Sequence, residues 1–386
     1  MFAGQRGGPF AYVTGGLFGL SALGMLASQL GQHAGGASKQ EMMRSRRAYL
    51  RHLAQQRRRA QEVIRDQRRT MFYRHPDPDR LWAIVDSPRL WERRPGDGDF
   101  LSVRIGLGRD RLAASIVPPA TKPLEDIDPM CALALRRFIT TYSEVDNLPL
   151  VMALDGFSRV HVTGDRDAVR GMVQAVIAQV AVFHAPDDVL VAVAASPEHR
   201  PGWEWLKWLP HSLHPTKMDA VGQRRLVTTT VSELEALLDD VIGGRPRYLA
   251  KQPDVRTSHP HVVVILDGGD PIGSKHLLVD GGLEGVTVID LSSPAPSVVD
   301  RSTLVLDISP EGRLSATTYE GRSEIGRPDR VETSLVESLA LTLAPRRLSV
   351  ASRQETPAVI RDMDLTELLN IGDPTTVDIQ AIWSGR

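Results

Sequence analysis

Apolar, β-branched runs alternate with amphipathic stretches through the middle of the chain, and this alternation restricts the possible folds more than any other feature. An apolar run at 160–162 leads through Thr163 and Gly164 into a predicted helix over 167–183, and a predicted strand over 189–194 follows. The same pattern continues with a helix over 231–242, strands over 261–267, 286–291, 303–308 and 313–318, and a last helix over 329–343. Strands that are apolar at nearly every position are buried on both faces. The sequence therefore predicts an α/β fold with a parallel sheet that helices cover on both sides.

Two further elements are predicted upstream of this region. Alternating apolar residues over 100–108, together with 111–117, indicate a β-hairpin. Asp128 is a suitable N-cap and Pro129 suits the first helical position, so a helix is predicted over 128–145.

Composition excludes several classes of protein. The 386 residues suffice for about two domains, or for one domain with appendages. A hydrophobic content of 42% and a charged content of 24% exclude a wholly disordered protein, a collagen and a polytopic transporter. The single cysteine, Cys131, is predicted to lie in the core, and no Cys/His cluster has the spacing of a zinc site. We therefore expect no disulfide framework and no metal site, which suits a cytosolic environment.

Charge is concentrated in one segment. The net charge is −1, but residues 39–69 carry eleven basic and three acidic side chains, a local charge of +8. The rest of the chain, apart from Arg6, carries −10. Whole-chain charge is therefore no guide to nucleic-acid binding.

The N-terminal region has the length and composition of a membrane segment. No charged residue lies between Arg6 and Lys39, and a helix over 10–31 would be about 33 Å long, enough to cross a bilayer. We assign residues 1–37 to a membrane segment. A buried glycine-rich helix and a signal peptide are the alternatives, but a signal peptide carries its positive charge before the apolar run, whereas here the charge follows it.

Small residues within this span recur at a spacing that suits helix packing. Ala11, Gly15 and Gly19 lie four residues apart on one face, which lets two membrane helices approach closely. We therefore expect this span to pack against other membrane helices.

The basic segment that follows is predicted to be a stalk. From Ser38 to Phe72 there is neither Pro nor Gly, and Ser38 is a suitable N-cap, so residues 38–72 should form one helix of about 50 Å. Positive charge after the apolar run places the bulk of the chain in the cytoplasm. The arginines suit contact with anionic lipid head groups or an acidic partner; a solvated face that only sets the topology is an equal alternative.

The first strand and helix of the α/β region have the order of a phosphate-binding loop, and the strand ending at Asp267 has the form of a Walker B strand. The chemistry is incomplete, because no Gly-Lys-Ser/Thr sequence is present there and Asp165 would repel phosphate. Gly164, Asp165, Arg166 and Asp267 are the predicted remnant of a nucleotide pocket. Weak nucleotide binding and a purely structural turn remain alternatives, and we expect no catalytic residue in this chain.

Three of the six tryptophans, Trp203, Trp205 and Trp208, lie within six positions. An exposed aromatic contact for a partner and a buried amphipathic loop are equally consistent with this run. The histidines of the α/β region lie in separate elements without metal spacing, so we interpret them as structural; they are His161, His184, His199, His211 and His214.

Several motifs occur together in the order found in a known family. They are Tyr49-Leu50-Arg51, Arg74-His75-Pro76-Asp77-Pro78, Trp91-Glu92-Arg93-Arg94-Pro95, the stretch 97–108, Trp203 to His211, and Ile371-Gly372-Asp373-Pro374. On these motifs nearly the whole chain resembles the N-terminal part of EccC, the membrane-anchored FtsK/SpoIIIE-type ATPase of mycobacterial and actinobacterial type VII (ESX) secretion systems.

The resemblance implies a domain order. Membrane helices and a stalk would precede a degenerate, P-loop-ATPase-like α/β domain, assigned to 73–355, and residues 356–386 would be a linker toward catalytic P-loop domains. ATP and magnesium are expected for those further domains and not for this segment. Family members have two membrane helices where one is predicted here, so we expect the chain to be a fragment of a longer protein.

The function implied by the resemblance is a motor subunit at the bacterial inner membrane. This segment would anchor the ATPase and couple it to other membrane components of an oligomeric secretion complex, while the ATPase domains bind secreted substrates. A DNA-translocase-type coupling protein and a non-catalytic membrane-anchored scaffold are the alternatives. Nucleic acid is not an expected partner, because the basic segment lacks the interleaved aromatic residues of a single-strand binder and lies beside the membrane.

Overall fold

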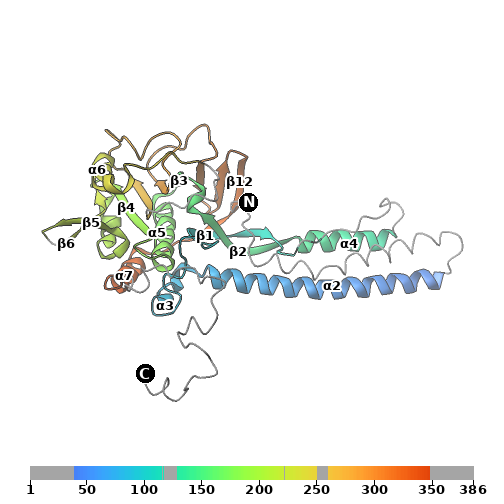
Figure 1. Ribbon diagram of the computed structural model, residues 1–386. Coiled ribbons are helices and arrows are strands. Elements are labelled where there is room, and N and C mark those ends of the chain that lie inside the picture. Colours follow the sequence, from blue (N-terminus) through green and yellow to red (C-terminus); the bar gives the residue numbers. More distant parts are fainter. Residues whose placement is uncertain (1–38, 115, 117–127, 221, 250–259, 348–386) are drawn as a thin grey trace, which may run out of the picture. The chain divides into compact units, whose positions relative to one another are not determined.

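The computed structural model describes residues 39–114, 116, 128–220, 222–249 and 260–347 (Figure 1). The α-helices are α2 (Lys39–Arg74), α3 (Trp82–Val85), α4 (Pro129–Tyr142), α5 (Arg166–Phe183), α6 (Val231–Ile242) and α7 (Thr333–Leu343), and the 3₁₀ helices are η3 (Pro78–Arg80), η5 (Leu154–Gly156), η6 (Arg200–Trp208) and η7 (Pro210–Ser212). The strands are β1 (Ser102–Arg111), β2 (Glu144–Ala153), β3 (Arg159–Gly164), β4 (Val189–Ala195), β5 (Leu213–Asp219), β6 (Gly222–Arg225), β7 (Val227–Thr228), β8 (His261–Asp267), β9 (Val286–Asp290), β10 (Thr303–Ile308), β11 (Leu314–Thr318) and β12 (Gly321–Pro328).

One half of the main sheet is parallel. Its strands follow the order β10-β3-β9-β8-β4-β7, and each neighbouring pair is parallel. Every residue of β4, β8 and β9 is buried, because α5 and α7 pack on one face of the sheet and α6 packs on the other. The prediction of an α/β fold with helices on both faces is confirmed for this half.

The other half of the sheet is antiparallel, so the prediction of a parallel sheet does not hold for this half. The order continues from β10 as β11-β12-β1-β2, with antiparallel pairing throughout. The predicted hairpin of 100–108 with 111–117 is also wrong, because β1 continues to Arg111 and pairs with β2, beyond α4. Leu112, which follows β1, is instead buried in a small cluster with Val145 and Leu148.

The long basic helix is present as one element. α2 has 36 residues, which confirms the prediction of a continuous helix in this region. It does not stand alone, because α4 runs beside it (Figure 1) and buries Cys131 and Phe138 against Tyr49 and Leu53. We call α2 and α4 together the arm.

The N-terminus of α4 forms as predicted. The Asp128 carboxylate accepts hydrogen bonds from the backbone N–H of Met130 and Cys131, and Pro129 occupies the first turn. The same carboxylate accepts from Arg46 Nε at 2.6 Å, which ties the cap of α4 to α2.

The described residues contain no helix that is both long and apolar enough to cross a bilayer. The predicted span at 10–31, with Ala11, Gly15 and Gly19, lies outside the described residues, as does the predicted linker at 356–386. The described residues also contain no group of three His, Cys, Asp or Glu side chains that could hold a metal ion.

Candidate functional site

Two residues of the predicted pocket meet at the carboxyl ends of β3 and β8. Asp267 ends β8 and is buried, and its Oδ1 lies 3.3 Å from Arg166 Nη2, in the first turn of α5. His199 Nδ1 lies 3.0 Å from the same oxygen, and Trp203 Nε1 donates a hydrogen bond to Oδ2 at 2.9 Å. Both carboxylate oxygens are therefore held by side chains of the chain itself.

The residues at this edge do not fit a magnesium nucleotide. A phosphate-binding loop needs several residues whose N–H groups surround the phosphates, whereas Asp165 alone separates β3 from α5. The Asp165 carboxylate caps α5 by accepting from Ala168 N–H at 3.0 Å. Gly164 has a φ of 131°, and a Cβ there would lie 2.4 Å from the Ile308 carbonyl oxygen, so β10 packs directly against the turn. Arg166 supplies the positive charge beside Asp267 where a bound cation would otherwise be needed.

The structure separates the three tryptophans. Trp203 and Trp205 are buried in the core, and Trp208 is 40% exposed, with Lys207 Nζ 5.5 Å from its ring centroid. Of the three predicted partner contacts, only Trp208 therefore lies at the surface. The indole N–H of Trp203 has an internal role as a donor to Asp267.

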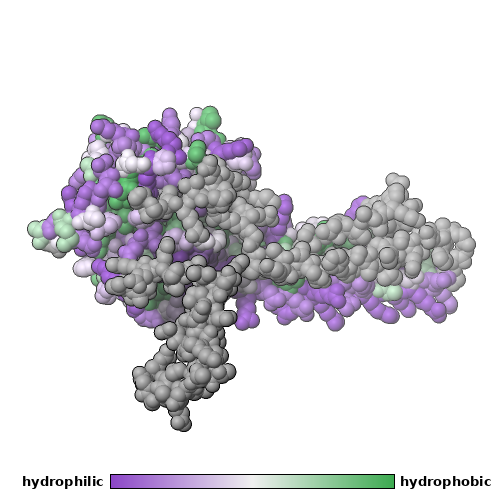
Figure 2. Space-filling view, viewed as in Figure 1, coloured by the Kyte–Doolittle hydropathy of each residue, from purple (hydrophilic) through white to green (hydrophobic). Residues whose placement is uncertain are grey.

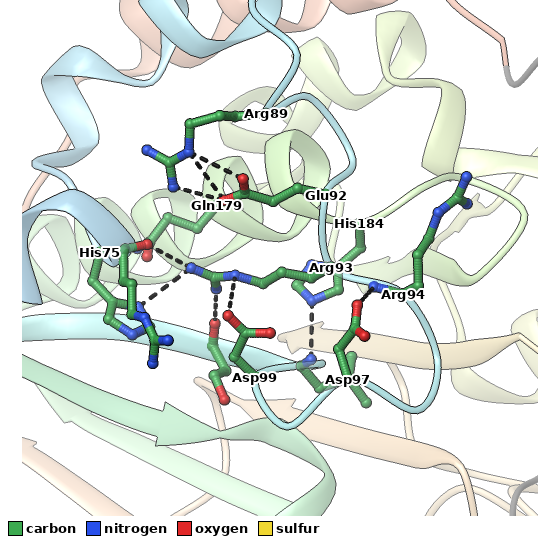
Figure 3. Close-up of polar contacts among 12 residues, drawn as sticks. His75, Arg89, Glu92, Arg93, Arg94, Asp97, Asp99, Gln179 and His184 are labelled. Atoms are coloured by element: carbon green, nitrogen blue, oxygen red, sulfur yellow. Dashed lines mark hydrogen bonds and ion pairs between the residues drawn. The ribbon is translucent and has the colours of Figure 1, made fainter. Parts of the chain in front are cut away.

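A second polar cluster lies where α2 meets the sheet (Figure 3). Helix ends leave their last carbonyl groups without partners within the helix. Arg93 Nη2 donates to the Arg74 carbonyl at 2.6 Å, and Arg104 Nη1 donates to the His75 carbonyl at 3.3 Å. Both arginines are at most 2% exposed. Two buried cations therefore close the C-terminal end of α2, which the helix dipole also favours.

The segment that carries Arg93 also closes the end of α5. The backbone N–H groups of Trp91 and Arg93 donate to the carbonyls of Val182 and Phe183 at 2.9 and 3.0 Å. Trp91 Nε1 donates to the Ala181 carbonyl at 3.0 Å, and the Arg93 guanidinium lies 4.1 Å from the centroid of the Phe183 ring. Residues 91–93 thus join the C-terminal ends of α2 and α5.

Arg104 extends these contacts to two further elements. Its guanidinium binds Asp329 through two nitrogens at 2.8 and 3.0 Å, and it binds Asp77 at 2.7 Å. Its backbone N–H and C=O both pair with the side-chain amide of Gln179, on α5, at 2.8 and 2.7 Å. We call Arg93 and Arg104, with the helix ends and carboxylates that they contact, the junction.

Two buried histidines border the junction in neutral form. Burial, with the charges of Arg93, Arg74, Arg104 and Arg89, lowers the pKa of His75 to about 3. Burial, with the charge of Arg93, also lowers the pKa of His184 to about 3. His184 Nε2 accepts from Leu101 N–H at 2.9 Å, and its Nδ1 lies 3.2 Å from the Val180 carbonyl.

The backbone at the junction is locally strained. Trp91 and Leu101 have φ values of 58° and 59°, in the left-handed region that non-glycine residues avoid at a cost of about 1–2 kcal/mol. The buried hydrogen bonds of both residues hold these conformations. Strain of this kind persists only where the surrounding contacts fix the backbone.

The sequence did not predict the junction; of the cluster around Asp267 it singled out Arg166 and Asp267, but not the contacts of His199 and Trp203. Arg93, Arg104 and Asp329 look like surface residues because charged side chains are rarely buried. The motifs at 74–78 and 91–95 did mark the region, since both converge on it.

The fold and these two clusters define a mixed α/β domain that carries a long basic helical arm. The chain is 43% identical, over 97% of its length, to the ESX secretion system protein EccC of Thermomonospora curvata, and covers 28% of that protein. It is 31% identical, over 81% of its length, to the ESX-4 secretion system protein EccC4 of Mycobacterium tuberculosis, and covers 22% of it. The chain is an EccC-type protein. It spans about a quarter of the length of these relatives.

No family model matches the chain. Among solved structures, EssC (ATPases 2 and 3) from Geobacillus thermodenitrificans has a TM-score of 0.39 at 10% identity, covering 66% of this chain and 50% of that one. Similarity at this level is too low to support a conclusion about the fold, which rests on the strand order above.

Proposed function

We propose that this chain is the anchoring and coupling segment of an EccC-type secretion protein. Residues 10–31 would span the bacterial inner membrane, and the arm would join this span to an α/β domain in the cytoplasm. Three observations support the proposal: the charge-free segment, the basic helix that directly follows it, and relatives named as ESX secretion system proteins.

The junction carries the coupling part of the proposal. A displacement of α2 has to move Arg93 and Arg104, because both are buried, Arg93 binds the Arg74 carbonyl that ends α2, and Arg104 binds the next carbonyl, that of His75. The same residues bind α5, β1 and the segment before α7, so the displacement reaches the sheet at β1 and the helix that packs on it. Packed interiors pass on such shifts because they have little free volume.

In this proposal the α/β domain is an adaptor and the motor lies elsewhere in the full-length protein. The contacts of Asp267 support this division, since Arg166, His199 and Trp203 already engage both of its carboxylate oxygens. ATP, magnesium and secreted substrates would bind to further domains. The adaptor would contact the other membrane components of an oligomeric secretion complex, with Trp208 as an available surface residue.

The test compares two arginines of one strand in the full-length protein. Arg104→Met removes a buried junction cation, and Arg109→Met removes an exposed cation of β1 that is paired with Glu144 and Asp146. Secretion by cells and assembly of the membrane complex are measured together. We expect Arg104→Met to reduce secretion while the complex still assembles, and Arg109→Met to leave both unchanged. Normal secretion with Arg104→Met would contradict the coupling role.

A further inference from the structure

Exposed apolar side chains gather at one end of the arm. Met42, Met43 and Leu50 near the start of α2 are 44–48% exposed, and Met130 and Leu133 in the first turns of α4 are 63% and 45% exposed. Elsewhere on α2, Tyr73 is the only large apolar side chain that is exposed, and it lies at the opposite end of this fully described helix. In Figure 2 the visible surface along α2 is largely hydrophilic, with paler apolar spots toward this end. The patch therefore belongs to the end of α2 that follows the charge-free segment.

A shallow groove lies within this patch, between the two helices. It is lined by Arg46, Leu50, Met130, Cys131, Leu133, Ala134 and Arg137. Five of these seven residues are apolar, and each helix contributes one arginine. Arg46 is held in place by Asp128, and Arg137 is exposed.

The charge around the groove is strongly positive. Residues 39–51 contain five basic side chains and one acidic side chain, and α4 contains two arginines and no acidic residue. Asp128, the N-cap of α4, neutralises Arg46, so the excess at the groove rests on the other basic side chains. An occupant that complements this surface must combine apolar groups with negative charge. The apolar segment 10–31 has no charged residue, so it would leave the arginines without counter-charge.

We propose that this groove docks on the head-group layer of an anionic bilayer, with Leu50, Met130 and Leu133 entering the interface and Arg137 binding a lipid phosphate. Surfaces that combine apolar side chains with arginines bind anionic membranes in this way. The inference rests on the proposed function, in which residues 10–31 span the membrane. Only seven residues, 32–38, separate that span from α2, and they reach at most about 25 Å when extended. The beginning of α2 is therefore held close to the bilayer.

The experiment places a fluorescent label on the full chain in lipid nanodiscs. Leu50→Cys and Gln61→Cys lie on the same face of α2, three turns and about 16 Å apart, and each is labelled with nitrobenzoxadiazole. Cys131 gives little background, because it is 1% exposed and burial raises its thiol pKa to about 11. Lipids with a nitroxide on the head group quench any label that enters the interface.

We expect quenching at position 50 to exceed that at position 61 by about twofold or more in bilayers containing phosphatidylglycerol, and to fall in neutral bilayers and in Arg137→Gln. Equal, weak quenching at both positions in a chain that is inserted overturns the docking proposal alone. If the label at position 50 reports an apolar environment but is not quenched, the docking proposal is overturned in favour of a protein occupant, such as a second copy. A chain that fails to insert into nanodiscs overturns the membrane anchoring of the proposed function itself.

Discussion

At the scale of single residues, the junction depends on buried charges that compensate one another. Arg104 is buried with Asp329, and burial raises the pKa of that carboxyl while Arg104 opposes the change. Burial lowers the pKa of Arg93 to about 10, so this side chain stays charged at neutral pH. Its donors reach carbonyl groups, namely those of Arg74 and Ser102. Removing one charge of the Arg104–Asp329 pair therefore leaves the other charge buried without its partner, which costs free energy.

Arg104→Met should destabilise the chain by about 3–5 kcal/mol, because Asp329 would remain buried without its partner. Urea unfolding of the detergent-solubilised chain measures the loss. Arg109→Met, on the same strand but with exposed partners, should change the midpoint little. Similar losses of stability in the two variants would show that the buried Arg104–Asp329 pair stabilises the fold no more than an exposed ion pair does.

The free energy of unfolding should also decrease as the pH is lowered, because the buried histidines take up protons when the chain unfolds. The folded-state pKa of His184 is about 3 and its ordinary value is 6.5, so the unfolded chain binds more protons between these values. The contribution of His184 is therefore complete above pH 6.5 and is lost as the pH falls, by about 2–3 kcal/mol at pH 4.5. His184→Gln should weaken the pH dependence of the free energy of unfolding by that amount. An unchanged pH dependence in the variant would mean that His184 is charged or accessible in the folded chain.

A third prediction concerns the hydrogen bond between Trp203 and Asp267. Trp203→Phe keeps most of the apolar volume but removes the donor to Asp267 Oδ2, leaving a buried carboxylate oxygen without that bond. We expect a loss of about 1–3 kcal/mol in the free energy of unfolding. Trp208→Phe is the matched control, because its side chain is 40% exposed and should change stability little. Equal effects would show that the Trp203–Asp267 hydrogen bond does not stabilise the fold.

At the scale of elements, the arm is stabilised by packing between two helices and by its attachment to the sheet. Tyr49 and Leu53 of α2 face Cys131 and Phe138 of α4. Gln67, farther along α2, donates to the Arg111 carbonyl at the end of β1. The contacts between α2 and α4 form a cluster separate from the main core, so α4 can loosen locally while the α/β domain stays folded.

Phe138→Ala should produce such local loosening. Removing a fully buried ring costs about 3–5 kcal/mol, and here the loss falls on contacts between α2 and α4. Hydrogen exchange resolved by peptide should rise in α4, while β4 and β8 stay protected. Faster exchange in β4 and β8 to the same degree would show that the arm and the sheet unfold as one unit.

At the scale of the whole molecule, local signals determined much of what could be predicted. α6 and β8 were predicted at their observed bounds, because Thr230 caps α6 by accepting from Glu233 N–H and β8 is apolar until Asp267. β2 and β12 were not predicted. β2 begins with charged residues and contains Pro149, and β12 is polar with two glycines. Both are strands because β1 pairs with them, and that pairing is set by contacts distant in the sequence.

The candidate sites follow the same division. Asp267 and the turn at Gly164 could be found, since a strand end and a glycine turn are local features. His199, Trp203 and the junction arginines could not, because their roles depend on which distant carbonyl or carboxylate they meet. A buried arginine in the sequence looks the same as an exposed one, as Arg104 and Arg109 show within one strand.

The central claim is that the junction fixes α2 rigidly to the sheet, and a distance measurement by pulsed electron paramagnetic resonance tests it most directly. Spin labels are placed at Gln61→Cys on α2 and at Glu311→Cys in the turn between β10 and β11, both exposed positions. Rigid attachment of α2 to the sheet predicts one narrow distance distribution in the chain with an intact junction and in Arg109→Met. It predicts a broad distribution when Arg93→Met and Arg104→Met are combined. A broad distribution with the junction intact, or a narrow one without it, would show that the junction does not fix α2 to the sheet.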